Sequence, residues 1–248
     1  MRTSNPALRE SVFKEAGRAG TAQGTMTING TIHKTGFLLV LATISAGLTW
    51  NSIQGGSPGE AAPWVFAGAI GGFIAAMVTS FKREWAPITA PIYAALEGLF
   101  LGGISAMYAA AYHGIIFQAV GLTFATLFIL LVAYRTGYIR ATEKFKAGVI
   151  AATGAIFVFY LVTMVLSLFH VPMPLIHSSG VFGIGFSVVV VVIAALNLVL
   201  DFDLIETGAS YGAPKYMEWY GGFALMVTLV WLYLEILRLL AKLQDRRG

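Results

Sequence analysis

The sequence predicts an all-α polytopic membrane protein, folded as a seven-transmembrane-helix bundle. Two observations predict this class. Of the 248 residues, 57% are hydrophobic and only 11% are charged, whereas an ordinary soluble domain has roughly 25% charged residues. The apolar residues also gather into seven stretches, each near the ~20 residues that a helix needs to cross a bilayer. This pattern excludes a soluble globular protein.

The seven predicted spans are separated by short links. The first link, 52–61, is rich in Gly, Ser and Pro, and the fifth, 171–180, contains two prolines; such residues end helices. Helix is favoured over strand throughout, because a segment in lipid must satisfy its own backbone hydrogen bonds. Glycines on the second and third spans favour close helix packing, and we expect the last span near the bundle centre. The predicted spans are residues 35–51, 62–81, 88–112, 115–134, 147–169, 181–203 and 219–243.

Lysine and arginine residues predict the topology. They occur before the first span and in the second, fourth and sixth links, but not in the odd-numbered links. Cytoplasmic loops carry an excess of these residues, so we expect a cytoplasmic N-terminus. One conflict remains: seven spans place the C-terminus outside, although the basic residues Arg238, Lys242, Arg246 and Arg247 crowd that end.

Three regions follow from this pattern. Residues 1–33 lack the apolar segment and cleavage site of a signal peptide, and we expect a disordered cytoplasmic tail. Residues 34–243 form the bundle, and 244–248 a short basic end. The absence of cysteine excludes disulfides and Cys-ligated zinc. The net charge of +4 is modest, so the expected partner is the lipid bilayer and not nucleic acid.

Acidic side chains within the spans are the strongest functional signal. A charge at the bilayer centre costs roughly 2.5–3.5 kcal/mol on insertion scales, so a carboxylate there usually faces a bundle interior or a water-filled path. The candidates are Glu97 in the third span, Asp201 and Asp203 closing the sixth, Glu206 just beyond it, and Glu235 in the last. Glu97 fits a neutral structural acid as well as a pathway ligand.

Helical geometry separates the acids of the sixth span. Asp201 and Asp203 are two residues apart, roughly 200° around the helix axis, so they cannot share a face. Asn197 lies one turn before Asp201, and Glu206 lies near one turn beyond Asp203. Asn197 with Asp201 and Asp203 with Glu206 thus form two polar stripes on different faces of the helix. At most one of these stripes can line the bundle centre. Alternatively, these acids mark a solvated cytoplasmic helix end.

Two interpretations of Glu235 are open. Arg238, three residues further along the helix, could form a local ion pair with it. Alternatively, Glu235 points into the bundle toward an acid of the sixth span, and two facing carboxylates then share a proton as coupled sites do. Such a pair could act as a proton-controlled latch. When ionised, it would offer the hard oxygen ligands that calcium prefers.

Motifs of enzymatic chemistry are not found. The sequence contains no HExxH, P-loop, GxGxxG or GxSxG pattern of the kinds that mark metalloprotease, nucleotide or nucleophile sites. The histidines His113, His170 and His177 fall in links, where solvated side chains are the common case. We therefore expect no enzymatic activity and no cofactor, apart from calcium as a permeant or bound ion.

Two acidic segments resemble a known family. Phe202-Asp203-Leu204-Ile205-Glu206 and Leu232-Tyr233-Leu234-Glu235 are similar to motifs of the Bax inhibitor family, the transmembrane Bax-inhibitor-motif proteins, in the bacterial branch that includes YccA-like members. The similarity extends over about residues 34–243 by span number and spacing. It implies a bacterial inner-membrane protein with a di-acidic pH sensor that controls a calcium leak. It also implies a role in cytoprotection.

The resemblance assigns roles to individual residues. Asp203 and Glu235 correspond to the sensor pair and are the candidate calcium contacts, with Glu in place of the family's Asp at 235. A basic residue at the start of the third helix is expected to latch the pair, and Lys82 and Arg83 are the nearest candidates. The remaining acids, Glu97, Asp201 and Glu206, are candidate pathway residues.

Two functions are thus expected from the sequence. The first is a pH-sensitive passive calcium or cation leak channel, gated by the coupled carboxylates Asp203 and Glu235. The alternative is a non-transporting membrane stress or quality-control factor. Such a factor would use its N-terminal tail to bind and modulate other membrane proteins, for example a membrane protease.

Overall fold

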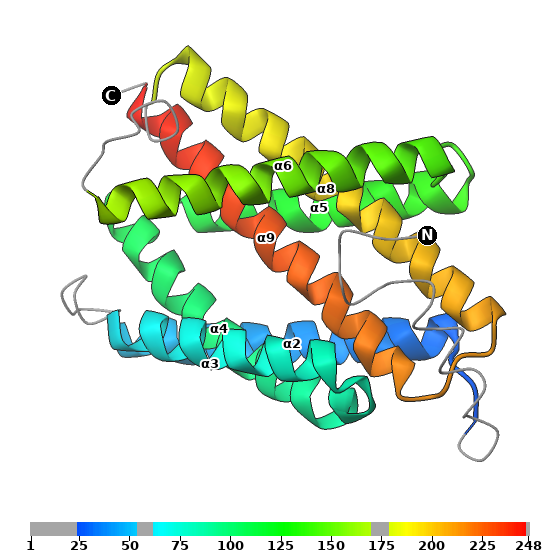
Figure 1. The fold of residues 1–248 in the computed structure, drawn as a ribbon. Helices are drawn as coiled ribbons and strands as arrows, with labels where there is room; N and C mark the ends of the chain where they lie inside the picture. Colours follow the sequence, from blue (N-terminus) through cyan, green and yellow to red (C-terminus); the bar gives the residue numbers. More distant parts are fainter. Residues whose placement is uncertain (1–23, 54–61, 170–178, 247–248) are drawn as a thin grey trace. The chain divides into compact units, whose positions relative to one another are not determined.

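A computed structural model describes residues 24–53, 62–169 and 179–246, and within these ranges all regular elements are helices (Figure 1). Seven of these helices are long and apolar enough to cross a membrane. The predicted all-α, seven-span class is confirmed. The elements are α2 (Ile28–Ile53), α3 (Ala62–Phe81), the 3-10 turn η3 (Arg83–Trp85), α4 (Ala86–Ala111), α5 (Ile115–Arg135), α6 (Glu143–Leu168), α8 (Val181–Ser210) and α9 (Met217–Asp245).

Large apolar side chains project from these helices without protein cover. Phe73 of α3 is 66% exposed and Phe117 of α5 is 88% exposed. A soluble monomer rarely exposes contiguous apolar surface of this kind, whereas in a bilayer these side chains contact lipid. The chain is therefore a multi-pass membrane protein.

Three helices, α2, α6 and α8, extend furthest beyond their predicted spans. α2 begins at Ile28 and not at 35, because the Thr27 hydroxyl caps it by accepting a hydrogen bond from Gly30 N at 3.0 Å. α6 begins at Glu143, where Thr142 caps the helix in the same way. α8 continues to Ser210, past the predicted end at 203. Residues 28–33, predicted as tail, are therefore helical, and residues 1–23 lie outside the described ranges.

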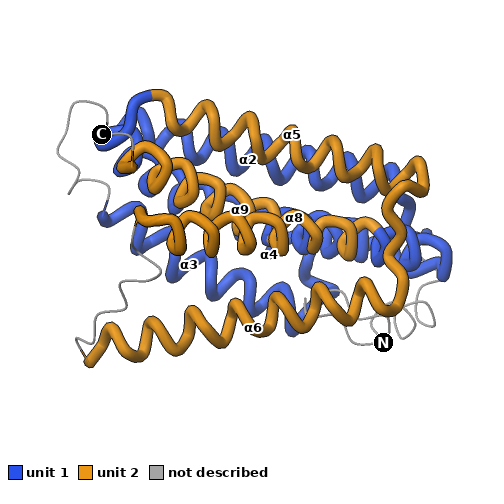
Figure 2. Tube along the Cα trace, turned by 90° about the horizontal axis from the view of Figure 1, so that it is seen from above, with its two compact units in different colours: residues 1–113, 203–227 blue, residues 114–202, 228–248 orange. Residues whose placement is uncertain are grey.

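The chain divides into two compact units (Figure 2). Unit 1 comprises residues 1–113 and 203–227, and unit 2 comprises residues 114–202 and 228–248. α8 and α9 each contribute to both units. The division falls between Phe202 and Asp203 on α8 and between Val227 and Thr228 on α9.

Small residues bring the helices of unit 1 together, as the glycine pattern predicted. α4 packs against both α2 and α3. A Cβ at Gly102 of α4 would lie only 2.5 Å from Ala46 O of α2, and Gly68 of α3 meets the backbone of α4 equally closely. Ser45 of α2 also donates a hydrogen bond to Ala95 O of α4 at 2.7 Å. Larger side chains at these glycines would separate the helices.

Polar and aromatic contacts join the helices of unit 2. Asn197 of α8 donates to the Thr153 hydroxyl of α6 at 2.8 Å. The rings of Phe159 on α6 and Phe186 on α8 lie 5.2 Å apart. An interhelical hydrogen bond of this kind compensates for a polar side chain inside a span.

α9 is the most buried of the seven candidate spans. Protein covers 67% of its most apolar segment, compared with 44% for α8 and 33% or less for each of the others. This burial agrees with the prediction of an interior last helix. It also explains how α9 can carry charged side chains within a span, because protein and not lipid surrounds them.

Candidate carboxylate sites

Glu235 lies in a three-residue polar cluster of unit 2. Its side chain is 2% exposed. Arg238 Nη1 donates to both carboxylate oxygens, at 2.8 and 2.9 Å, and the Tyr160 hydroxyl of α6 donates to Oε1 at 3.0 Å. Arg238 Nη1 also donates to the Tyr160 hydroxyl at 2.7 Å. The structure thus shows the local Glu235–Arg238 ion pair, with Tyr160 as a further partner.

The acids of α8 follow the predicted helical phasing. Asn197 and Asp201, one turn apart, are 6% and 1% exposed. Asp203 is only half-buried, and Glu206 is exposed. The Asn197–Asp201 stripe is therefore the buried one. A solvated helix end describes Glu206 but not Asp201, which lies inside a helix that continues to Ser210.

The predicted sensor pair joins residues of different units. Asp203 belongs to unit 1 and Glu235 to unit 2, so their direct coupling stays a prediction. Within the described ranges, no group of three or more His, Asp or Glu side chains is arranged to hold a metal ion. Calcium contact at Asp203 and Glu235 likewise stays a prediction.

Glu97 lies at the packed face between α4 and α3 in unit 1. It is 9% exposed, and Tyr93, one turn earlier on α4, donates a hydrogen bond to it. Gly72 of α3 leaves room for the carboxyl group, since a Cβ there would lie 3.0 Å from Glu97 Oε2. Tyr93 in turn packs edge-on against Phe223 of α9, with ring centroids 4.9 Å apart. These surroundings fit the structural-acid alternative.

The candidate latch residues precede α4. Lys82 is exposed, and the Arg83 guanidinium lies 5.8 Å from the Tyr220 ring of α9. Arg83 Nε is buried and has no hydrogen-bond partner among the residues that the structure describes. Burial raises the pKa of the nearby Tyr216 hydroxyl, which Glu84 raises further and Arg83 lowers. Arg83 thus faces the start of α9 within unit 1, and its latch role stays a prediction.

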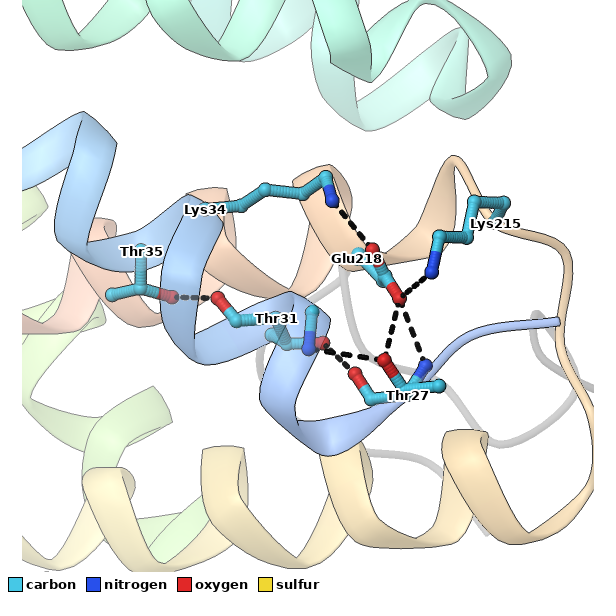
Figure 3. A network of polar contacts seen from close by, with 7 residues as sticks. Thr27, Thr31, Lys34, Thr35, Lys215 and Glu218 are labelled. Carbon is cyan, nitrogen blue, oxygen red and sulfur yellow. Dashed lines mark hydrogen bonds and ion pairs between the residues drawn. The ribbon is translucent and has the colours of Figure 1, made fainter.

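A further buried carboxylate, Glu218, joins the start of α2 to the start of α9 in unit 1 (Figure 3). We call Thr27, Lys34, Lys215 and Glu218 the Glu218 clasp. The Glu218 side chain has no exposed surface, and Lys34 and Lys215 approach its oxygens at 2.5 and 2.7 Å. Thr27 donates to Oε1 from its backbone N at 3.0 Å and from its hydroxyl at 2.9 Å. These donors offset the cost of burying the charge.

Backbone contacts extend the clasp to the segment before α2. Met26 N donates to Ala213 O at 2.6 Å, and Lys215 N donates to Gly24 O at 3.2 Å. Gly212 allows the sharp turn between α8 and α9, because its φ of 67° is left-handed. Gly30 is required for another reason: a Cβ at this position would collide with the Glu218 carboxylate.

Sequence reasoning missed the clasp and the role of Tyr160. Thr27 lies 191 residues from Glu218, and Tyr160 lies 75 residues from Glu235. No local spacing connects such partners. The one available signal was an acidic residue in the first turn of the last helix, a position that a helix dipole favours.

The fold and its buried acids define a class, namely a seven-helix membrane protein with ionisable side chains inside its spans. The Bax inhibitor 1-like family matches residues 5–245, nearly the whole chain, and the chain belongs to that family. The family predicted from the two acidic segments is confirmed, while the bacterial YccA-like branch stays a prediction. Comparisons with curated proteins and with solved structures give no significant match.

Proposed function

We propose that the protein is a pH-sensitive passive leak for calcium or other cations, with Asp203 and Glu235 as sensor and gate. The observation that carries the proposal is the Glu235 cluster, a buried acid in the last span whose partners come from its own helix and from α6. An ionisable residue within a span is by default a functional candidate. Membership of the Bax inhibitor 1-like family supports the same function.

The contacts of Glu235 suit a proton-dependent switch. As a carboxylate, Glu235 accepts hydrogen bonds from both Arg238 and Tyr160. A proton on Glu235 removes the negative charge and therefore weakens the ion pair with Arg238. Arg238 is 37% exposed, so protein does not enclose its guanidinium on all sides. Protonation would thus loosen the contact between α6 and α9, and Asp203 would share the proton with Glu235.

The proposed activity is transport down a gradient, not enzymatic catalysis, and it requires no cofactor. We place the protein in a bacterial inner membrane with its N-terminus in the cytoplasm. The distribution of Lys and Arg, which favours the links on one side of the membrane, supports this orientation.

Calcium flux in proteoliposomes tests the proposal. The purified protein is reconstituted with an entrapped calcium dye, and influx is measured as the pH is varied. We expect wild-type flux to change with pH, and Asp203→Asn or Glu235→Gln to remove that change. Glu143→Gln is the matched control, because this acid is exposed at the start of α6.

Two outcomes contradict the proposal. Unchanged pH dependence in both neutralised variants would show that these carboxylates are not the sensor. A complete absence of flux would exclude a leak, and the non-transporting membrane stress factor would then be the better description of the protein.

A further inference from the structure

The last helix carries a row of charged residues on one face. Glu235, Arg238 and Lys242 are spaced i, i+3 and i+7, which brings 235 and 242 within about 20° of each other around the axis. All three belong to unit 2. A cation that moved between Glu235 and the C-terminal end of α9 would therefore pass two positive side chains, Arg238 and Lys242.

Lys242 is a buried cation at this end of the row. The residue is 6% exposed. Its Nζ donates to the Ser187 hydroxyl at 2.8 Å and to Gly183 O at 3.1 Å, both in the first two turns of α8. Because oxygen acceptors hold the ammonium group in place, Lys242 contributes a fixed positive charge and not a mobile surface charge. Burying such a charge is costly, which favours a function over incidental placement.

The charge of Lys242 reaches the proposed sensor. Lys242 interacts electrostatically with both Arg238 and Glu235. Seven residues of helix separate positions 235 and 242 by about 10 Å along the axis. At that separation, with an effective dielectric constant of about 20, repulsion by one fixed charge lowers the local concentration of a monovalent cation about tenfold. For a divalent cation the energy doubles and the factor is about a hundredfold.

We propose that Lys242 is a charge-selecting residue that opposes the passage of cations, and of divalent cations most strongly, along the C-terminal half of α9. The inference rests on the proposed leak and names the residue that limits cation flux through it. A fixed cation next to the sensor keeps calcium flux low while the sensor residues remain intact. Lys242 acts here through its charge, and its hydrogen bonds to α8 serve to hold that charge in place.

Two substitutions at Lys242 separate charge from structure. Lys242→Gln removes the charge but keeps N–H donors for Ser187, and Lys242→Arg keeps the charge. Ser187→Ala weakens the anchor without changing any charge, and Lys144→Gln removes an exposed lysine at the start of α6. Size-exclusion chromatography confirms that each variant is folded before reconstitution.

The measurement is the ratio of calcium to potassium flux in proteoliposomes. We expect Lys242→Gln to raise potassium flux about tenfold and calcium flux about a hundredfold, so that the ratio rises about tenfold. Lys242→Arg and Lys144→Gln should keep the wild-type ratio, and so should Ser187→Ala, because Gly183 O still holds the Lys242 ammonium group in place. General loosening of the fold would raise both fluxes together and leave the ratio unchanged.

Each other outcome has a defined meaning. A wild-type leak with an unchanged ratio in Lys242→Gln overturns the role of Lys242 and leaves the proposed leak in place. An equal rise in Ser187→Ala also overturns it. If neither wild type nor Lys242→Gln conducts, both proposals fail. If only Lys242→Gln conducts, Lys242 blocks the path as inferred, and the wild-type protein is not an open leak.

Discussion

Two buried carboxylates, Glu218 and Glu235, have different surroundings. Glu218 has two lysine partners and two donors from Thr27, and no part of its side chain is exposed. Glu235 has one cationic partner, Arg238, which is 37% exposed. A carboxylate with four donors, two of them from lysines, suits a permanent structural contact. The donors of Glu235 are one partly exposed arginine and the neutral Tyr160 hydroxyl, which suits a contact that can open. We therefore assign structure to Glu218 and sensing to Glu235.

Gly30→Ala tests the structural role of the Glu218 clasp. An added Cβ collides with the Glu218 carboxylate, so either the carboxylate leaves its donors or α2 shifts. Overpacking of this kind costs about 1–3 kcal/mol. We expect a lower thermal unfolding temperature in detergent.

The matched control is Gly36→Ala on the same helix, where a Cβ meets open space. Alanine in a helix interior is about 0.5–1 kcal/mol more favourable than glycine, so this variant should unfold at the wild-type temperature or above it. Equal unfolding temperatures for Gly30→Ala and the wild type would show that the clasp does not constrain α2.

At the scale of helices, hydropathy predicts where the chain crosses the membrane but not where each helix ends. α3 has its predicted bounds, 62–81, because apolar sequence and helix coincide there. α2 begins earlier because Thr27 caps it, and polar residues before the apolar stretch become helical. Hydropathy reports only the apolar part of a helix, whereas caps and tertiary contacts determine its hydrogen-bonded length.

For the candidate carboxylate sites, too, sequence predicted the relations within one helix but not the contacts between helices. Helical spacing correctly separated Asp201 from Asp203 and correctly placed Arg238 beside Glu235. Both relations are local to one helix, so sequence alone contains them. The contact of Tyr160 with Glu235 joins two helices, and their packing depends on the whole fold.

Deletion of the N-terminal residues tests whether calcium flux depends on the helices alone. The structure indicates where to cut: residues 24–27 contact the α8–α9 turn and Glu218, so deletion of residues 1–23 leaves the clasp complete. We expect this variant to retain wild-type calcium flux, because a leak resides in the helices. Loss of flux upon this deletion would contradict that view, and a tail-dependent partner interaction would be favoured instead.

At the scale of the whole molecule, the contacts of the C-terminal basic residues address the topology conflict. Arg238 is paired with Glu235, and Lys242 is buried against α8. Neither is a free loop charge of the kind that the positive-inside rule counts. When Arg238 and Lys242 are left out of the count of loop charges, fewer basic residues oppose a topology of seven spans. Seven spans place the C-terminus on the side opposite to the link between α5 and α6.

Cysteine labelling tests this topology, and the chain contains no cysteine that would give background. Tyr138→Cys lies in the α5–α6 link and is 89% exposed in the wild type, and Arg246→Cys follows α9. In sealed right-side-out vesicles, an impermeant maleimide should label position 246 directly and position 138 only after permeabilisation. Labelling of both from the same side would contradict seven spans.

The central claim is that Asp203 and Glu235 act as one coupled sensor. The most direct test is a double-mutant cycle on the pH dependence of calcium flux, using Asp203→Asn, Glu235→Gln and the combined variant. Coupled residues give non-additive effects, so we predict that the combined variant loses no more pH dependence than either single variant. Independent, additive losses from the two substitutions would contradict the shared-proton gate.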